Sequence, residues 1–242
     1  MELSPDSIII WQWQSIVLNA TILYTWLMMA GLVLGAGWVT RRLSVEPPLS
    51  RAQNLLEVVV STIRDQIQDI IADKVDHYLP FIGTLFLFIS MSNLLGLVPG
   101  FHPPTGSLST TAALATCVFF AVPIYGIAQQ GVTGYFKHYL EPSPFMLPFH
   151  VMGELSRTLA LAVRLFGNVM SGSTVVAILL SIVPLFVPVV MQLLELLIGQ
   201  IQAYIFAVLT TVYIASALQA HEEKERSQNL RSSKGDSHLN TL

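Results

Sequence analysis

Residues 144–182 read PFMLPFHVMGELSRTLALAVRLFGNVMSGSTVVAILLSI, and residues 184–219 form a second apolar stretch of similar length. At 1.5 Å per residue each stretch would make a helix of roughly 55 Å, whereas the hydrocarbon core of a bilayer is about 30 Å thick. Neither stretch contains a polar turn strong enough to divide it into two spans. We therefore expect two long, strongly tilted transmembrane helices that form a hairpin at residues 184–188.

The composition of the whole chain also indicates a membrane protein. Of its 242 residues, 53% are hydrophobic and only 11% are charged, whereas soluble domains carry about 25% charged residues. So few charges cannot cover a water-facing surface, which excludes a soluble globular enzyme. The net charge of −3 provides no basic surface for nucleic acid. Cys117, the single cysteine, lies in an apolar run and is expected to be a buried, inert thiol.

Three further spans are expected in the first half of the chain. The charge-free interval 7–40 holds one span, about residues 16–39, and the interval 77–136 holds two, about residues 79–98 and 108–128. A segment rich in proline and glycine at residues 99–106 separates the last two. Adding the tilted hairpin, about residues 144–219, the sequence predicts an all-α membrane protein with five membrane-crossing helices.

Residues 49–74 differ from the spans because charged side chains alternate there with apolar ones at helical spacing. This pattern is typical of an amphipathic helix that lies on the membrane surface. A helix packed against a soluble partner is the alternative interpretation.

The positive charges predict the orientation of the chain. With five crossings, all Lys and Arg residues outside the tilted hairpin fall on one side: Arg41, Arg42, Arg51, Arg64, Lys74, Lys137, Lys224, Arg226, Arg231 and Lys234. The positive-inside rule then puts the N-terminus outside and the C-terminus in the cytoplasm. The expected division is an external N-terminal segment (1–15), a membrane domain (16–220) and a cytoplasmic tail (221–242) whose composition predicts disorder.

Polar and ionisable side chains within the tilted hairpin mark the candidate functional site. Each ionisable group at bilayer depth costs about 2.5–3.5 kcal/mol on insertion scales. Helical spacing puts one group of them on a single face of the first helix, with Leu161 at the missing step: His150, Glu154, Arg157, Arg164, Asn168 and Ser171. The second helix carries a matching stripe: Gln192, Glu195, Gly199 and Gln202. Two facing polar stripes in apolar helices are what an ion pathway requires.

Arg164 is the central residue of this arrangement. It lies about ten residues deeper than Glu154, and an arginine remains a fixed cation in low dielectric. The alternative role is a salt bridge to Glu195 that pins the hairpin. Glu195 in hydrocarbon favours its neutral form, which suits either a proton relay or a buried neutral acid.

The remaining polar groups have simpler alternatives. Glu154 and Arg157, one turn apart, are expected to form a local ion pair near the cytoplasmic interface. Asn168 and Gln202 are candidates for ordinary interhelical hydrogen bonds. Three histidines near predicted interfaces receive no role: His77, His102 and His138.

Residues 164–168 (RLFGN), preceded by ELSR at 154–157, resemble a signature of subunit a of F-type ATP synthases. Residues 201–210 (IQAYIFAVLT) are similar to the second signature of that family, on its last span. Residues 93–100 (NLLGLVPG) resemble the end of the family's second span. The resemblance covers nearly all of residues 16–220.

The resemblance implies an ion-translocating stator subunit that is not catalytic by itself. Two half-channels and an essential arginine would couple H⁺ or Na⁺ flow to rotation of an oligomeric c ring. Arg164 matches that arginine, and Gln202 and Asn168 match the family's glutamine and asparagine beside it. Glu195 occupies an ionisable position of the outer half-channel. Ser173 stands nine residues after the arginine, where relatives carry an acid or a histidine, and this departure leaves room for a sodium-type relative.

The family also implies the surroundings of the site. His150, Glu154 and Arg157 would line or brace the inner half-channel. The expected partners are the c ring, b-type peripheral stalk subunits, the F1 sector and the lipid bilayer, with no nucleic acid, and no cofactor or metal is expected. A bacterial plasma (inner) membrane is the expected location.

Two other classes of protein compete with this interpretation. A self-contained ion-coupled secondary transporter would be expected to show an internal repeat and unwound, glycine-rich spans, and neither is evident. A purely structural scaffold would not explain an arginine at bilayer depth. Because no Walker loop is present, any ATP chemistry must reside on other subunits.

Overall fold

The computed structural model describes residues 9–13, 16–41, 51–71, 75–98, 101–140, 147–182 and 187–239. The first described elements are two short antiparallel strands, β1 (Ile9–Trp13) and β2 (Ile16–Asn19), which lead directly into helix α1 (Ala20–Thr40). All other elements in the described ranges are helical. The expected external segment 1–15 is described only over β1, so its placement stays a prediction.

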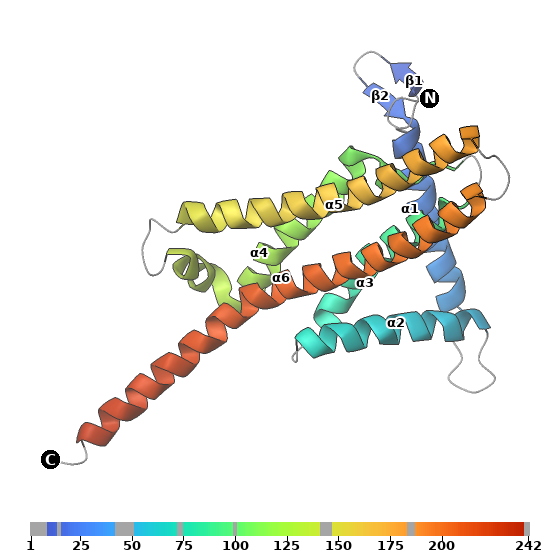
Figure 1. Ribbon diagram of the computed structural model, residues 1–242. Coiled ribbons are helices and arrows are strands. Elements are labelled where there is room, and N and C mark those ends of the chain that lie inside the picture. Colours follow the sequence, from blue (N-terminus) through green and yellow to red (C-terminus); the bar gives the residue numbers. More distant parts are fainter. Residues whose placement is uncertain are drawn as a thin grey trace.

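Helix α2 (Arg51–Ile70) is the expected amphipathic helix. Ile63 and Ile67 are buried against the neighbouring helices, whereas the charged Glu57 and Asp65 are exposed. In Figure 1, α2 runs across the lower end of α1 rather than parallel to it. This orientation is the one expected of a helix that lies along a membrane surface while α1 crosses it.

Helices α3 (Val75–Leu95) and α4 (Leu108–Leu140) are the second and third spans, and the short 3₁₀ helix η2 (Pro104–Gly106) lies between them. Helix α4 continues about twelve residues beyond its expected end. It is broken at Gly131, whose φ of 74° favours glycine because this residue lacks a Cβ atom.

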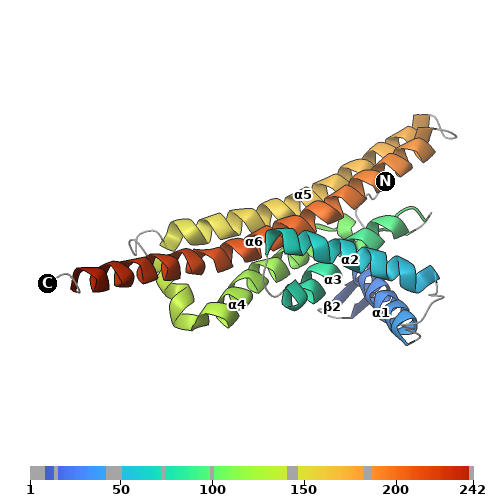
Figure 2. The same ribbon diagram turned by 90° about the horizontal axis from the view of Figure 1, so that it is seen from below.

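The last two helices are α5 (Leu147–Ile182) and α6 (Val187–Leu239). They lie side by side in both views and are strongly inclined to α1 (Figures 1 and 2), which confirms the expected hairpin of long, tilted helices. Its turn, residues 183–186, lies outside the described residues. The disordered tail expected from residue 221 onward stays a prediction, although α6 is traced as far as Leu239.

Five helices are long and apolar enough to cross a membrane, as the sequence predicts: Ala20–Thr40, Val75–Leu95, Leu108–Gln129, Pro148–Ile182 and Val187–Leu218. The core between them is built by large side chains from α3, α5 and α6, including Tyr78, Ile89, Leu161, Leu165 and Phe206. The chain is a multi-pass, predominantly α-helical membrane protein.

The expectation for Cys117 is wrong, because this side chain is exposed on α4. Many large apolar side chains are exposed as well, among them Phe120 and Ile124 of the same helix. Lipid tails are as apolar as leucine, so an apolar run in a membrane helix does not imply burial within the protein. These surfaces are available to lipid or to partner subunits.

Candidate ion-pathway site

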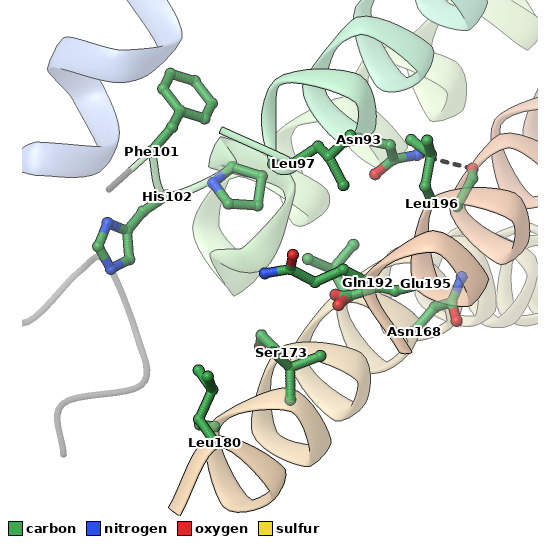
Figure 3. Close-up of a pocket in the computed structure, with 16 residues that line it drawn as sticks. Asn93, Leu97, Phe101, His102, Asn168, Ser173, Leu180, Gln192, Glu195 and Leu196 are labelled. Atoms are coloured by element: carbon green, nitrogen blue, oxygen red, sulfur yellow. Dashed lines mark hydrogen bonds between the residues drawn. The ribbon is translucent and has the colours of Figure 1, made fainter. Parts of the chain in front are cut away.

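A cavity of about 240 Å³ opens between α3, the segment before η2, and the two tilted helices. Its polar lining comes from four separate parts of the chain: Asn93 of α3, His102, Asn168 and Ser173 of α5, and Gln192 and Glu195 of α6. In Figure 3, Gln192 and Ser173 extend into the same space from α6 and α5, and His102 lies at one end of the lining. The cavity occupies the part of the hairpin nearest its turn, on the side away from the predicted positive charges.

Glu195 is the one acidic side chain that lines this cavity within the described residues. Its carboxyl group rests against the backbone of Gly172 on α5: a Cβ atom at position 172 would lie 2.6 Å from Cδ and Oε1 of Glu195. Only glycine leaves room for this contact. In the described part of the chain, Glu195 makes no hydrogen bond or ion pair, so its carboxyl group is available to an ion or to water.

Arg164 lies on α5 outside the lining of this cavity. Its neighbours Leu161 and Leu165 are 1% and 0% exposed, whereas Arg164 itself is exposed. Across the described ranges Arg164 has no ion pair or hydrogen bond, so the alternative salt bridge to Glu195 is not formed. Eight residues separate Arg164 from Gly172, which corresponds to about 12 Å along the helix axis.

The polar residues that the sequence puts on one face of α5 differ in their exposure. Asn168 lines the cavity, whereas Arg157, Arg164 and Ser171 are exposed and Leu161 is packed in the core. At 100° per residue Arg164 and Asn168 lie about 40° apart around α5, so helical spacing still puts them on one face. They differ in that Asn168 lines the cavity, whereas Arg164 is exposed outside it.

Gln202 lies on α6 at the level of Arg164. Because α5 and α6 are antiparallel and Gly172 meets Glu195, equal helical rise puts Arg164 level with Ala203, next to Gln202. Gln202 is 6% exposed, and its buried Nε2 atom has no acceptor within the described residues. A buried amide donor without a partner is costly.

The other end of α5 carries the residues assigned to the inner side. Glu154 and Arg157 form the expected local ion pair, with 3.7 Å between Oε1 and Nη1. The Arg157 guanidinium also lies over the ring of Tyr213 on α6, at 5.4 Å from its centroid. His150 is half-buried one turn before Glu154. Their role in an inner half-channel stays a prediction.

Sequence reasoning missed two features of the site. His102, to which no role was assigned, lines the cavity and stacks with Tyr24 of α1 at 6.5 Å between ring centroids. Hydrogen bonds from Ser90 and Asn93 of α3 to α6 were also missed. In the sequence, these hydrogen bonds are indicated only by polar residues near the end of an apolar span. Such a pattern does not reveal which residues of another helix they bond.

Comparison with known proteins gives a consistent result. Residues 22–215 match the family model described as "ATP synthase A chain". "ATP synthase subunit a 2" of Acaryochloris marina is 62% identical over 222 residues, which cover 92% of this chain and 95% of that protein. "ATP synthase subunit a 1" of Crocosphaera subtropica is 60% identical, covering 93% and 97%, and "ATP synthase subunit a" of Nitrosospira multiformis is 54% identical, covering 92% and 89%.

Proposed function

Because the chain belongs to the ATP synthase A chain family, we propose that Arg164 separates two half-channels through which it couples ion flow to the rotation of a c ring. The chain is the ion-translocating stator subunit of an F-type ATP synthase, a component of a larger complex. It is not catalytic by itself, and ATP is made or hydrolysed on the F1 sector.

The cavity around Glu195 is the outer half-channel. This assignment is supported by a cavity large enough for water, lined by one carboxyl group, three amides, a hydroxyl and an imidazole, in a part of the hairpin expected at bilayer depth. Polar groups at that depth are expensive and usually mark an ion pathway. Glu195 receives the ion in this half-channel, and Asn168, Ser173 and Gln192 provide oxygen atoms around it.

Arg164 acts on the carboxyl groups of the ring. A ring carboxyl that comes to face the guanidinium is driven to ionise, because a nearby cation favours the charged form. It releases its ion to one half-channel and is reloaded from the other after the ring turns. Gln202 lies on α6 at this level, buried within the chain, and belongs with Arg164 to the ion pathway. Each charge that crosses gains about 2.3 kcal/mol per 100 mV, so several crossings are needed for each ATP.

The inner half-channel begins at the other end of α5, where His150, Glu154 and Arg157 lie. Glu154 and Arg157 pair with each other, which keeps both charged groups at a level where water can reach them. The charge distribution supports a cytoplasmic location for this end and for the C-terminus, with the N-terminus outside. The proposed location is a bacterial plasma (inner) membrane.

The partners are the c ring against the exposed face of α5 around Arg164, b-type peripheral stalk subunits and, through the complex, the F1 sector. The observation that carries the proposal is an exposed arginine at mid-helix with no intramolecular ion pair among the described residues. Such a charge requires a partner that the chain itself does not supply.

Affinity purification of the tagged chain in mild detergent tests the assembly. We expect recovery of a small two-span hairpin subunit with an intramembrane carboxyl group, together with nucleotide-binding subunits. Recovery of the chain alone, monodisperse and active in ion transport after reconstitution, would instead indicate a self-contained secondary transporter. The coupling ion, H⁺ or Na⁺, is identified by measuring how the activity of the purified complex depends on the concentration of each ion.

A further inference from the structure

Helices α3 and α6 are joined by a compact set of hydrogen bonds. The Ser90 hydroxyl donates to Oε1 of Gln200 at 2.6 Å, and Nε2 of Gln200 donates back to the backbone carbonyl of Ser90 at 3.0 Å. One turn along α3, Nδ2 of Asn93 donates to the carbonyl oxygen of Gly199 at 2.7 Å (Figure 3). We name these four residues the α3–α6 clamp.

The clamp is specific in its geometry. The Gln200 amide uses both its donor and its acceptor on a single residue of α3, so it fixes the distance and the angular position of α6. Gly199 allows the second contact, because a Cβ atom there would lie 2.9 Å from Cγ of Asn93. Lipid-exposed apolar helices have little directional restraint on sliding or rotation. Bonds of this kind therefore determine the register of the pair.

The clamp lies between the two residues of α6 that face the ion pathway. Glu195 is one turn before Gly199, and Gln202 is two residues after Gln200. A change of one residue in the α3–α6 register would turn α6 by about 100° and shift it by 1.5 Å. Glu195 would then leave its contact with Gly172, and Gln202 would leave the level of Arg164.

We propose that Ser90 and Gln200 are positioning residues for ion translocation: they hold α6 so that Glu195 enters the outer cavity and Gln202 remains at the level of Arg164. This inference rests on the proposed function of the cavity. Substitution of the clamp residues should therefore impair ion loading from the outer side without reducing the amount of assembled complex.

The test uses the complete complex in proteoliposomes, with the rate of ATP synthesis measured against the coupling-ion concentration on the outer side. In Gln200→Leu we expect the apparent KM for the ion to rise about threefold to tenfold, the range that corresponds to one or two interhelical hydrogen bonds in a membrane. Ser90→Ala, which leaves the Ser90 carbonyl in place, should show a smaller rise. Ser90→Thr, which keeps the hydroxyl, should restore the normal KM.

Thr84→Val on the same helix is the matched control. Its hydroxyl is exposed and donates to Phe81 O of its own helix, so its removal should leave the KM unchanged. A normal KM in both Gln200→Leu and Ser90→Ala overturns the clamp, as does an equal rise in Thr84→Val. If Gln200→Leu fails to assemble, the contrast between Ser90→Ala and Ser90→Thr decides.

Arg164→Ala separates this inference from the function on which it rests. Coupled transport by that variant would refute the proposed function. Blocked transport by Arg164→Ala together with an unchanged KM in the clamp variants would refute the clamp alone.

Discussion

Gly172→Ala is the sharpest perturbation that the site offers. The added Cβ atom would lie 2.6 Å from Cδ and Oε1 of Glu195 and 2.7 Å from Cγ, whereas ordinary contacts begin at 3.4 Å. An overlap of about 0.8 Å with three atoms cannot be absorbed without moving the carboxyl group or separating α5 from α6. Because the three atoms are the far end of a flexible side chain, Glu195 relieves the overlap chiefly by moving its carboxyl group, and the cost falls at the low end of the 1–3 kcal/mol typical of overpacking, about 1 kcal/mol. If that energy falls on ion loading at Glu195, transport slows by about fivefold.

The assay is ATP-driven ion uptake by membrane vesicles, normalised to the amount of assembled complex. Gly83→Ala on α3 is the control, because nothing lies within 4 Å of the added Cβ atom; we expect normal uptake there. Glu195→Asp, which is shorter by one methylene group, should restore part of the rate when combined with Gly172→Ala. Normal uptake by Gly172→Ala alone would refute the contact and the reasoning built on it.

Two further variants probe the charged groups. Glu195→Gln keeps the shape of the side chain but cannot ionise, so we expect slow transport in a fully assembled complex, measured as ATP-driven uptake; an unchanged rate would make Glu195 a structural residue. Arg64→Ala removes an exposed ion pair to Asp76, with 3.1 Å between Nη2 and Oδ1 and side chains that are 51% and 75% exposed. Exposed pairs contribute about 0–1 kcal/mol, so complex yield and uptake should stay within twofold of normal, and a large loss would show that α2 depends on this pair.

The sequence predicts the long helices well because their length and lack of charge leave few alternatives. The two apolar stretches of the hairpin exceed the bilayer thickness, and only strong tilt reconciles them with a single crossing each. The end of α4 was not predictable from hydropathy, because the helix continues past the apolar residues, through the break at Gly131, to Leu140. Nothing in the sequence distinguishes Gly131 from a glycine in an ordinary helical conformation.

Arg164 and Glu195 could be found from sequence because ionisable groups in apolar helices are rare and costly. The sequence does not reveal, however, that Glu195 lines the cavity whereas Arg164 lies outside it. Periodicity puts Arg164 and Asn168 on one face, but it does not reveal that Asn168 lines the cavity whereas Arg164 is exposed outside it. The contact of Gly172 with Glu195 and the bond of Ser90 to Gln200, 110 residues away, depend on how helices rotate against one another. That rotation is a property of tertiary packing.

In the proposed function, Arg164 keeps two half-channels apart and supplies the charge that releases the ion from the ring. The most direct measurement is ion flux through the assembled complex carrying Arg164→Ala, recorded with ATP present and with a membrane potential alone. We expect loss of ATP-driven transport, together with passive ion leakage where the wild-type complex is tight. ATP-driven transport at the wild-type rate, with no leakage, would contradict it.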